Sequence, residues 1–176
     1  MSTIRVAGYK KHSFVDGPGV RFTVFTQGCP HACPKCQNPE TWDTTGGDLM
    51  KVSTIVQKIA GANYLDGVTL SGGDPVWQAE SCYEIARASH KLGLNVWLYS
   101  GYTWEQIMDG LAGEAAMKLL QEVDVLVDGR FIAQRRDSTL PFRGSSNQRI
   151  IDVQASLAAG DIKYAPEYYE QVSKAL

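Results

Sequence analysis

The stretch that decides the fold is "RFTVFTQGCPHACPKCQN", residues 21–38. Its first seven residues are rich in β-branched and aromatic side chains and predict a strand. Cys29, Cys33 and Cys36 follow that strand in a single loop. Clustered thiols indicate a metal or redox site, but a closed tetrahedral metal site needs a fourth ligand. The three cysteines therefore raise the question of what completes the site.

Further runs of the same composition predict the rest of a sheet, at residues 67–71, 95–100, 123–128 and 149–153. Residues 52–59 and 78–92 have helical periodicity, and residues 103–106 have the spacing of a capping box. Strands that alternate with helices predict an α/β fold with a parallel sheet. A complete eight-unit barrel needs about 250 residues. The 176 residues of this chain therefore predict an open partial (βα) barrel of about five to six units.

We expect this barrel to form a single domain over residues 1–176, with a flat doubly wound sheet as the alternative. Unusual residues follow four of the predicted strands. They are the cysteine run, "SGGDP" at 71–75, "SGYT" at 100–103 and "DGRF" at 128–131. Because the carboxyl ends of parallel strands meet at one edge of the sheet, these loops predict a functional site at that edge.

The composition is that of an ordinary globular protein, 44% apolar and 20% charged, and the net charge of −2 argues against a nucleic-acid partner. The sequence shows no signal-peptide core and no apolar run of about 20 residues, so we expect a cytoplasmic protein with no membrane partner. Five arginines are opposed only by Asp137 and predict a solvated or partner-facing surface. They are Arg130, Arg135, Arg136, Arg143 and Arg149.

The cysteines alone leave several chemistries open. A structural zinc site would need His31, His12 or Cys82 as the fourth ligand. Cys82, however, lies in a helical stretch and is expected in the core, and the two histidines are expected to make local hydrogen bonds. A catalytic disulfide would use two cysteines and leave the third without a role. A 4Fe-4S cluster held by three cysteines would keep one iron open for a ligand that is not protein.

Several segments, which together cover most of the chain, carry a resemblance to a known family. They are "VDGPGVRFTVFTQGC" (15–29), "CQNPETWD" (36–43), "LSGGDP" (70–75), "SGYTWEQI" (100–107), "VDVLVDGRF" (123–131) and "FRGSSNQRIID" (142–152). In this order they resemble the activating proteins of anaerobic ribonucleoside-triphosphate reductases, which are radical S-adenosylmethionine enzymes. The cysteine run is moderately specific by itself, and its combination with the other segments is strongly so.

The resemblance implies that Cys29, Cys33 and Cys36 bind a 4Fe-4S cluster and that S-adenosylmethionine binds the open iron. One electron from the cluster would cleave this cofactor to methionine and a 5'-deoxyadenosyl radical. No catalytic residue is implied beyond the cluster ligands. The residues implied in cofactor binding are Lys35, Cys36, Gln37, Gly72, Gly73, Asp74, Asp128 and Arg130.

These residues are expected to act in different ways. Glycines let the backbone come close to the cofactor, and Asp74 or nearby carbonyls would accept hydrogen bonds from its ammonium group. Arg130 offers a forked donor for its carboxylate, with Asp128 organising the same loop. Two positions depart from the wider family. Lys35 stands where many members have an aromatic residue, and Tyr99 and Ser100 stand where formate-lyase activators have an acidic one.

The implied partners are a large glycyl radical subunit, that of anaerobic ribonucleoside-triphosphate reductase, and a low-potential electron donor such as a flavodoxin or a ferredoxin. The radical would abstract the α-hydrogen of one glycine of that subunit. A partial barrel leaves an open side for the loop that carries this glycine. The turn at residues 16–19 is expected near the site. Two alternatives remain, an activase of another glycyl radical enzyme and a non-catalytic zinc-binding module.

Overall fold

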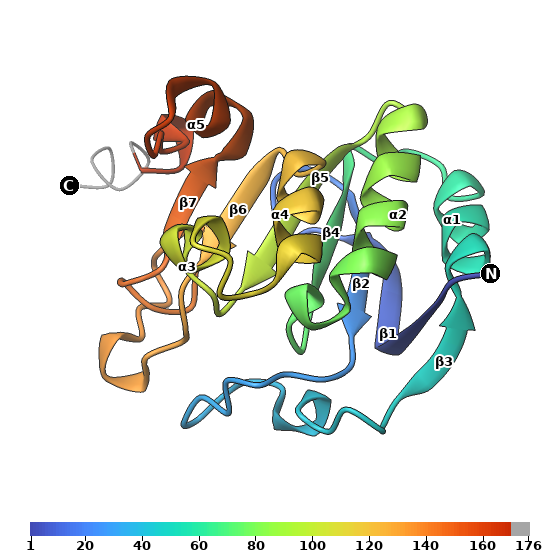
Figure 1. The fold of residues 1–176 in the computed structure, drawn as a ribbon, viewed down its shortest axis with the longest axis horizontal. Coiled ribbons are helices and arrows are strands. Elements are labelled where there is room, and N and C mark those ends of the chain that lie inside the picture. The colour runs from blue at the N-terminus through green and yellow to red at the C-terminus, as the bar shows by residue number, and fades with distance from the viewer. Residues whose placement is uncertain (170–176) are drawn as a thin grey trace.

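A mixed seven-stranded sheet in the order β3-β1-β2-β4-β5-β6-β7 forms the frame of the protein (Figure 1). The computed structural model describes residues 1–169, so the end of the expected domain, residues 170–176, lies outside the described part. The strands are β1 (Thr3–Ser13), β2 (Arg21–Thr26), β3 (Asp48–Lys51), β4 (Gly67–Gly72), β5 (Asn95–Ser100), β6 (Val125–Asp128) and β7 (Arg149–Asp152). The sheet is open, because β3 and β7 are at opposite ends of the strand order.

The centre of the sheet is parallel, since β2, β4, β5 and β6 pair in that order and in the same direction. Helices make the crossovers between these strands. They are α1 (Val52–Ala60), α2 (Ala79–Lys91), α3 (Trp104–Met108) and α4 (Glu114–Gln121). Figure 1 shows α1, α2 and α4 side by side on one face of the sheet. The predicted α/β class with an open, partly barrel-like sheet is confirmed.

The main apolar core lies between this helical layer and the sheet. Alternate residues of the central strands, such as Phe22, Val24, Val68 and Leu70, are fully buried there. Cys82 on α2 belongs to the same core, as expected, and none of its side chain is exposed. The capping box of α3 is also confirmed, with the Thr103 side chain accepting from the Gln106 amide. Within residues 1–169, no helix is long and apolar enough to cross a bilayer.

The expected sheet of parallel strands is wrong at its margins. β7 runs antiparallel to β6 because residues 129–148 contain only the short 3-10 helix η3 (Ala133–Arg135) and no crossover helix. β1 and β3 were not expected at all, and both run antiparallel at the other margin. β3 is mostly exposed, and β1 is mostly exposed over its second half, so neither has the buried apolar run that marks the central strands.

The opposite face of the sheet carries a smaller core of Trp97, Val127, Ile150 and Ala165. Beyond β7 the chain continues into α5 (Val153–Ala159) and η4 (Pro166–Tyr168), and Tyr168 packs edge-on against Trp97. Two further 3-10 helices, η1 (Pro39–Thr41) and η2 (Pro75–Gln78), lie in the loops after β2 and β4. Apart from this small core, the face has no helical layer and is left free for a site.

Candidate active site

A pocket of about 660 Å³ lies at the carboxyl edge of the parallel strands. It is lined from the loops after β2, β4, β5 and β6, as the strand ends predict. The rest of its lining comes from Phe25 and Tyr99 on the strands, from residues 14–16, and from Ser138, Leu140, Phe142, Arg143, Gly144 and Gln148. Asp16 is among these, which confirms that the turn beginning there lies at the site. The volume is in the range of pockets that bind small cofactors.

The three cysteines Cys29, Cys33 and Cys36 all line this pocket, are partly buried and form no disulfide. Two residues with left-handed backbone precede the second and third of them, Ala32 at φ +45° and Lys35 at φ +58°. Such conformations reverse the chain locally, at a cost of about 1 kcal/mol or more each. Cys33 and Cys36, which follow these reversals, both line the pocket, and the Cys36 amide donates to the Cys33 carbonyl at 3.1 Å.

The thiols sit in an environment that favours their neutral form. Burial raises the pKa of Cys29 to about 11, although the backbone at His31 and Ala32 acts in the opposite direction. Burial also raises the pKa of Cys33, against contributions from the Phe131 backbone and from Arg130. Thiolates bind metals, so a cluster bound here would displace protons and its positive iron ions would offset the cost of burying the charge. The three partly buried thiols on one pocket are the ligand type that an iron–sulfur cluster takes, although among residues 1–169 no three such side chains are grouped closely enough to hold a single metal ion.

Glycines at the end of β4 allow its backbone to lie close to the backbone of β2 and of the cysteine loop. Gly72 has φ +104°, and a Cβ added to it would lie 2.4 Å from the Thr26 amide nitrogen. A Cβ on Gly73 would lie 2.4 Å from the Gly28 carbonyl oxygen. Both glycines line the pocket, but their Cβ directions point into the backbone of β2 and of the cysteine loop. Their absence of side chains thus lets the β4 loop pack against the cysteine loop.

Asp74 joins three of the loops from a fully buried position. Its carboxylate accepts from the Val76 amide at 3.0 Å, from the Ser100 hydroxyl at 3.0 Å and from the Gly101 amide at 2.9 Å. The His31 ring Nε2 lies 2.7 Å from the same carboxylate. Asp74 does not line the pocket. The carboxylate thus has protein partners from three loops, and the contact of Asp74 or nearby carbonyls with a cofactor ammonium group stays a prediction.

Both histidines make hydrogen bonds, as expected, but their partners are distant in the sequence. His31 bonds to Asp74, which is 43 positions away, and its ring packs edge-on against Tyr102. His12 lies 3.0 Å from the carbonyl of Asn63, 51 positions away. Cys82 is fully buried in the helical core and supplies no fourth ligand for zinc, whereas His31 lines the same pocket as the three cysteines.

Asp128, at the end of β6, is also buried and lies outside the pocket lining. It accepts from the Trp104 amide at 2.8 Å and from Arg149 Nε at 3.0 Å. Arg149 also bonds both oxygens of Glu105, at 2.9 and 2.7 Å, and this pairing lowers the pKa of Glu105 to about 2. Asp128 therefore anchors the loop after β6 to α3 and β7.

The remaining predicted residues divide into two groups. Gln37 and Arg130 are exposed residues that line the pocket, whereas Lys35 is exposed and does not. Arg143 and Gln148 also line it and were not predicted individually, although both lie in the "FRGSSNQRIID" segment. Phe14 and Val15 line it as well, and both are largely exposed. Phe14 was not predicted, whereas Val15 adjoins the turn at residues 16–19 that was expected near the site.

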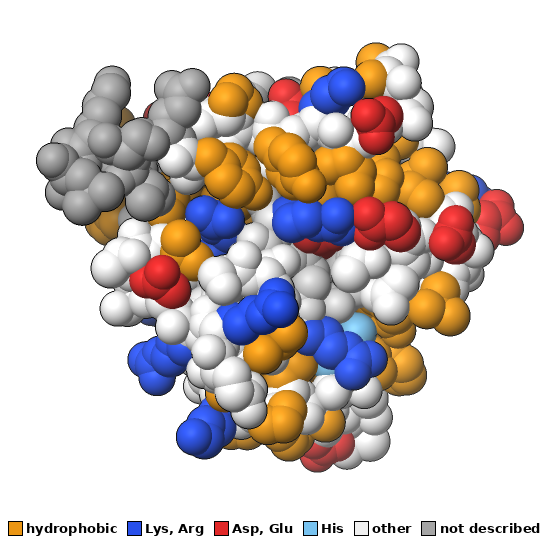
Figure 2. Space-filling view, turned by 90° about the vertical axis from the view of Figure 1, so that its left-hand side faces the viewer, with side chains coloured by type: hydrophobic (Ala, Val, Ile, Leu, Met, Phe, Trp, Pro, Cys, Tyr) orange, Lys and Arg blue, Asp and Glu red, His pale blue; other side chains and the backbone are white. Residues whose placement is uncertain are grey.

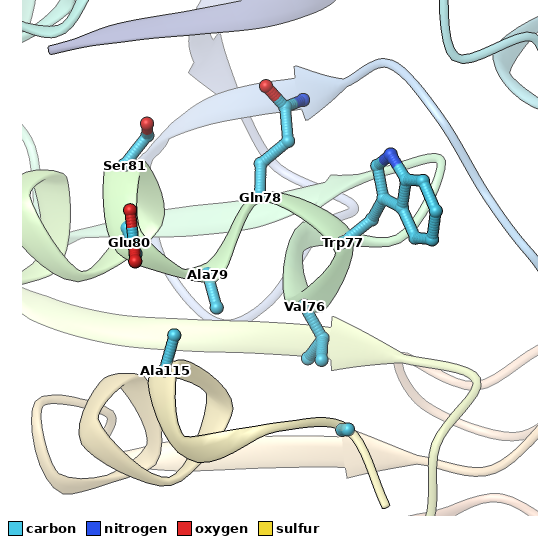
Figure 3. A pocket seen from close by; sticks show the side chains of 8 residues that line it. Val76, Trp77, Gln78, Ala79, Glu80, Ser81 and Ala115 are labelled. Carbon is cyan, nitrogen blue, oxygen red and sulfur yellow. The ribbon is translucent and has the colours of Figure 1, made fainter.

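A second, smaller hollow of about 330 Å³ lies beside the start of α2, between Val76, Ala79 and Ala115 (Figure 3). Its lining includes Glu80 but no cysteine or histidine. Trp77 borders this hollow and points away from it in Figure 3. The Trp77 indole packs over Gly28, where a Cβ would lie 2.7 Å from its Cδ1. The larger pocket, with its three thiols, is therefore the candidate active site.

Comparison with known proteins gives a consistent result. The model of the "4Fe-4S single cluster domain" family matches residues 15–151. An anaerobic ribonucleoside-triphosphate reductase-activating protein of Salmonella typhi is 32% identical, over 82% of this chain and 96% of its own. Proteins with the same name from Escherichia coli K12 and Enterobacteria phage T4 are 33% and 34% identical, over 80% and 78% of this chain and 93% and 86% of their own.

The chain belongs to the family of anaerobic ribonucleoside-triphosphate reductase-activating proteins. The predicted family is thereby confirmed, as is the 4Fe-4S class of cofactor. A solved structure of QueE from Escherichia coli is also similar, with a TM-score of 0.45 and 16% identity over 57% of this chain and 53% of that one.

Proposed function

We propose that this activating protein is an oxidoreductase that uses a 4Fe-4S cluster and S-adenosylmethionine to create a glycyl radical in a large subunit, that of anaerobic ribonucleoside-triphosphate reductase. The observation that carries the proposal is the placement of three cysteines on one pocket at the carboxyl edge of the sheet, with the fourth cysteine of the chain buried elsewhere. Membership of the family supports the choice of partner, since the relatives are named for that reductase.

Cys29, Cys33 and Cys36 would hold three irons of the cluster, which leaves one iron open to the amino and carboxylate groups of S-adenosylmethionine. When bound and reduced by one electron, this pair of cofactors supplies methionine and a 5'-deoxyadenosyl radical that takes the α-hydrogen of a partner glycine. The electron must come from a low-potential donor, because no side chain of the pocket supplies one.

The chain's own residues bind and orient. Arg130 would donate to the cofactor carboxylate, and Gln37 and the backbone at Gly72 and Gly73 would contact the rest of the cofactor from the pocket wall. Asp74 and Asp128 would act from behind that wall, by fixing the loops that carry these groups. The face of the sheet without a helical layer, where Phe14 and Val15 are exposed beside the pocket, would admit the glycine-bearing loop of the partner.

Anaerobic reconstitution with iron and sulfide tests this proposal. The reconstituted protein, supplied with dithionite and S-adenosylmethionine, is expected to form 5'-deoxyadenosine. With the large subunit added, electron paramagnetic resonance is expected to show a glycyl radical on that subunit. A protein that binds zinc in preference to a cluster, or that forms no 5'-deoxyadenosine under these conditions, would refute it. Radical formation only on a formate-lyase type partner would assign it to another glycyl radical enzyme.

A further inference from the structure

The segment "GSSNQR", residues 144–149, has no part in the mechanism above, yet its side chains are closely bonded to the loop that follows β6. Gln148 Oε1 accepts from the amides of Gly144 and Ser145, at 2.8 and 3.2 Å. Its Nε2 donates to the Gly129 carbonyl at 3.0 Å. One side-chain amide thus ties the chain just before β7 to the chain just after β6.

Asn147 makes a second bond to the loop after β6, at the residue that follows Gly129. Its Nδ2 donates to the Arg130 carbonyl at 2.8 Å. Its Oδ1 is buried and has no hydrogen-bond partner within the described part of the chain. A buried acceptor without a partner is costly. Asn147 therefore holds the Arg130 carbonyl although its own Oδ1 is buried unfavourably without a partner. An apolar side chain would fill the same space without that cost, so the amide donor is the property that the position needs.

We propose that Asn147 and Gln148 are positioning residues, an amide clamp that holds residues 129–131 in the wall of the pocket that Cys33 also lines. This inference rests on the proposed function, because the held segment faces the cluster and cofactor site. Gly129, Arg130 and Phe131 line the same pocket as Cys33. Hydrogen bonds to the sulfurs of an iron–sulfur cluster and positive charge near it raise the reduction potential of the cluster.

The clamp has a firm support on its other side. The Ile132 amide donates to the hydroxyl of fully buried Ser145 at 3.2 Å, and the Ser146 amide donates to the Arg135 carbonyl at 2.8 Å. Arg149, next to Gln148, bonds Asp128 and Glu105. The two halves of the loop between β6 and β7 are therefore bonded to each other and to the sheet. Asn147 and Gln148 are thus fixed in position and can in turn fix residues 129–131.

The substitutions Gln148→Glu and Asn147→Asp test the clamp because each changes mainly one function of an amide. In Gln148→Glu the side chain keeps its length and can still accept from the amides of Gly144 and Ser145, but a carboxylate cannot donate to the Gly129 carbonyl. Asn147→Asp removes the donor to the Arg130 carbonyl in the same way. Ser146→Ala is the matched control, since Ser146 is exposed and its hydroxyl makes no hydrogen bond among residues 1–169.

In the reconstituted protein, both test variants are expected to keep the iron and sulfide content of the wild type. Their affinity for S-adenosylmethionine is expected to fall about five-fold, as loss of one typical hydrogen bond implies. Redox titration followed by electron paramagnetic resonance is expected to give a more negative cluster potential. In the metal-free protein, hydrogen exchange is expected to accelerate at residues 129–132 and to stay unchanged in α2. Ser146→Ala should match the wild type in all four measurements.

Wild-type cofactor affinity, cluster potential and exchange rates in both test variants would overturn the clamp and leave the proposed function standing. Conversely, a wild-type protein that binds no cluster would overturn the proposed function, while hydrogen exchange of the metal-free chain would still decide whether the amides hold residues 129–131. If Gln148→Glu fails to fold, Asn147→Asp decides alone, and an unchanged affinity and exchange rate in that variant would overturn the proposal.

Discussion

Substitution of Cys33 tests most directly whether a cysteine of the loop is a cluster ligand or has a structural role. It lies in an irregular loop on the pocket, outside both apolar cores. Cys33→Ala is therefore expected to abolish cluster assembly and 5'-deoxyadenosine formation while the melting temperature of the metal-free protein changes little. Iron analysis and the absorbance of the reconstituted protein measure the first effect.

Cys82 is the matched control for that substitution. It lies in the main core with none of its side chain exposed, and burial raises the pKa of its thiol. Cys82→Ala is expected to leave the iron content unchanged and to lower the stability by about 1 kcal/mol, as expected for a small cavity. Loss of the cluster in Cys82→Ala, or its retention in Cys33→Ala, would show that the ligands are misassigned.

Arg130 is exposed on the pocket wall and makes no ion pair among the described residues. Arg130→Ala is expected to weaken S-adenosylmethionine binding about ten-fold, because a charge-assisted hydrogen bond contributes about 1.5 kcal/mol. The iron content should not change. Equilibrium binding to the reconstituted protein measures the effect. Arg136→Ala removes a charge from the same loop outside the pocket lining, and an equal loss in that variant would indicate a general electrostatic effect instead.

At the scale of elements, the end of α2 meets the turn between α4 and β6 in a cluster of titratable side chains. His90 Nε2 lies 2.9 Å from Asp124, and Nδ1 lies 3.2 Å from Glu122. Burial lowers the pKa of His90, but the hydrogen bonds to Asp124 and Glu122 outweigh this, so the pKa is raised above 6.5. The positive charge also lies in the last turn of its helix, where it is favoured.

The sign of the pH dependence follows from this raised pKa. The unfolded chain releases the His90 proton at a lower pH than the folded protein does. The contribution of charged His90 to the free energy of unfolding is therefore fully present below about pH 6.5. It is lost as the pH rises through the pKa of His90 in the folded protein. For a partly exposed pair we expect about 0.5 kcal/mol. Urea unfolding of the wild type and of His90→Gln between acidic and mildly alkaline pH measures it, and a constant difference between the two would contradict it.

The elements also show what the sequence predicts and what it does not. The strands that begin at Arg21, Gly67 and Asn95 were predicted because both of their faces are buried in a parallel sheet, which requires continuous apolar runs. β1 and β3 lie at one margin, where exposed polar positions interrupt the pattern. The direction of β7 is not written in its own residues. It depends on the connection across residues 129–148, which has no crossover helix.

The same distinction holds for the candidate site. The cysteine loop and the glycines were identified because unusual residues follow successive strand ends. The bonds of Asp74 to His31 and to Ser100 were not, because the partners are 43 and 26 positions away and only the strand order brings them together. Gln148 was missed for a related reason, since its role depends on a carbonyl 19 positions earlier in the chain.

At the scale of the whole molecule, the net charge of −2 hides an uneven distribution of charge. The loop between β6 and β7 carries Arg130, Arg135, Arg136 and Arg143 with only Asp137 opposing them. Figure 2, which faces the side where this loop lies in Figure 1, shows Lys and Arg side chains among hydrophobic ones. An exposed surface with this mixture, beside the pocket, suits a protein partner that must bring a peptide loop to the site.

Reversal of charge in this loop tests that docking surface. Arg135 and Arg136 are exposed and lie outside the pocket lining, so Arg135→Glu combined with Arg136→Glu should not alter the site itself. The double variant is expected to raise the concentration of large subunit needed for half-maximal glycyl radical formation about ten-fold, and the effect should shrink at high salt, because rim charges act mainly on encounter. Formation of 5'-deoxyadenosine without the partner should not change.

The matched control is Lys91→Glu combined with Lys118→Glu, which changes the net charge equally on the helical layer, across the sheet from the pocket. If docking depends on the loop between β6 and β7, this control should need no more partner than the wild type does. Equal losses in both double variants would assign the effect to net charge alone. The partner would then approach without preference for the loop, and the open side of the sheet, rather than the arginines beside it, would have to provide the specificity for the glycine.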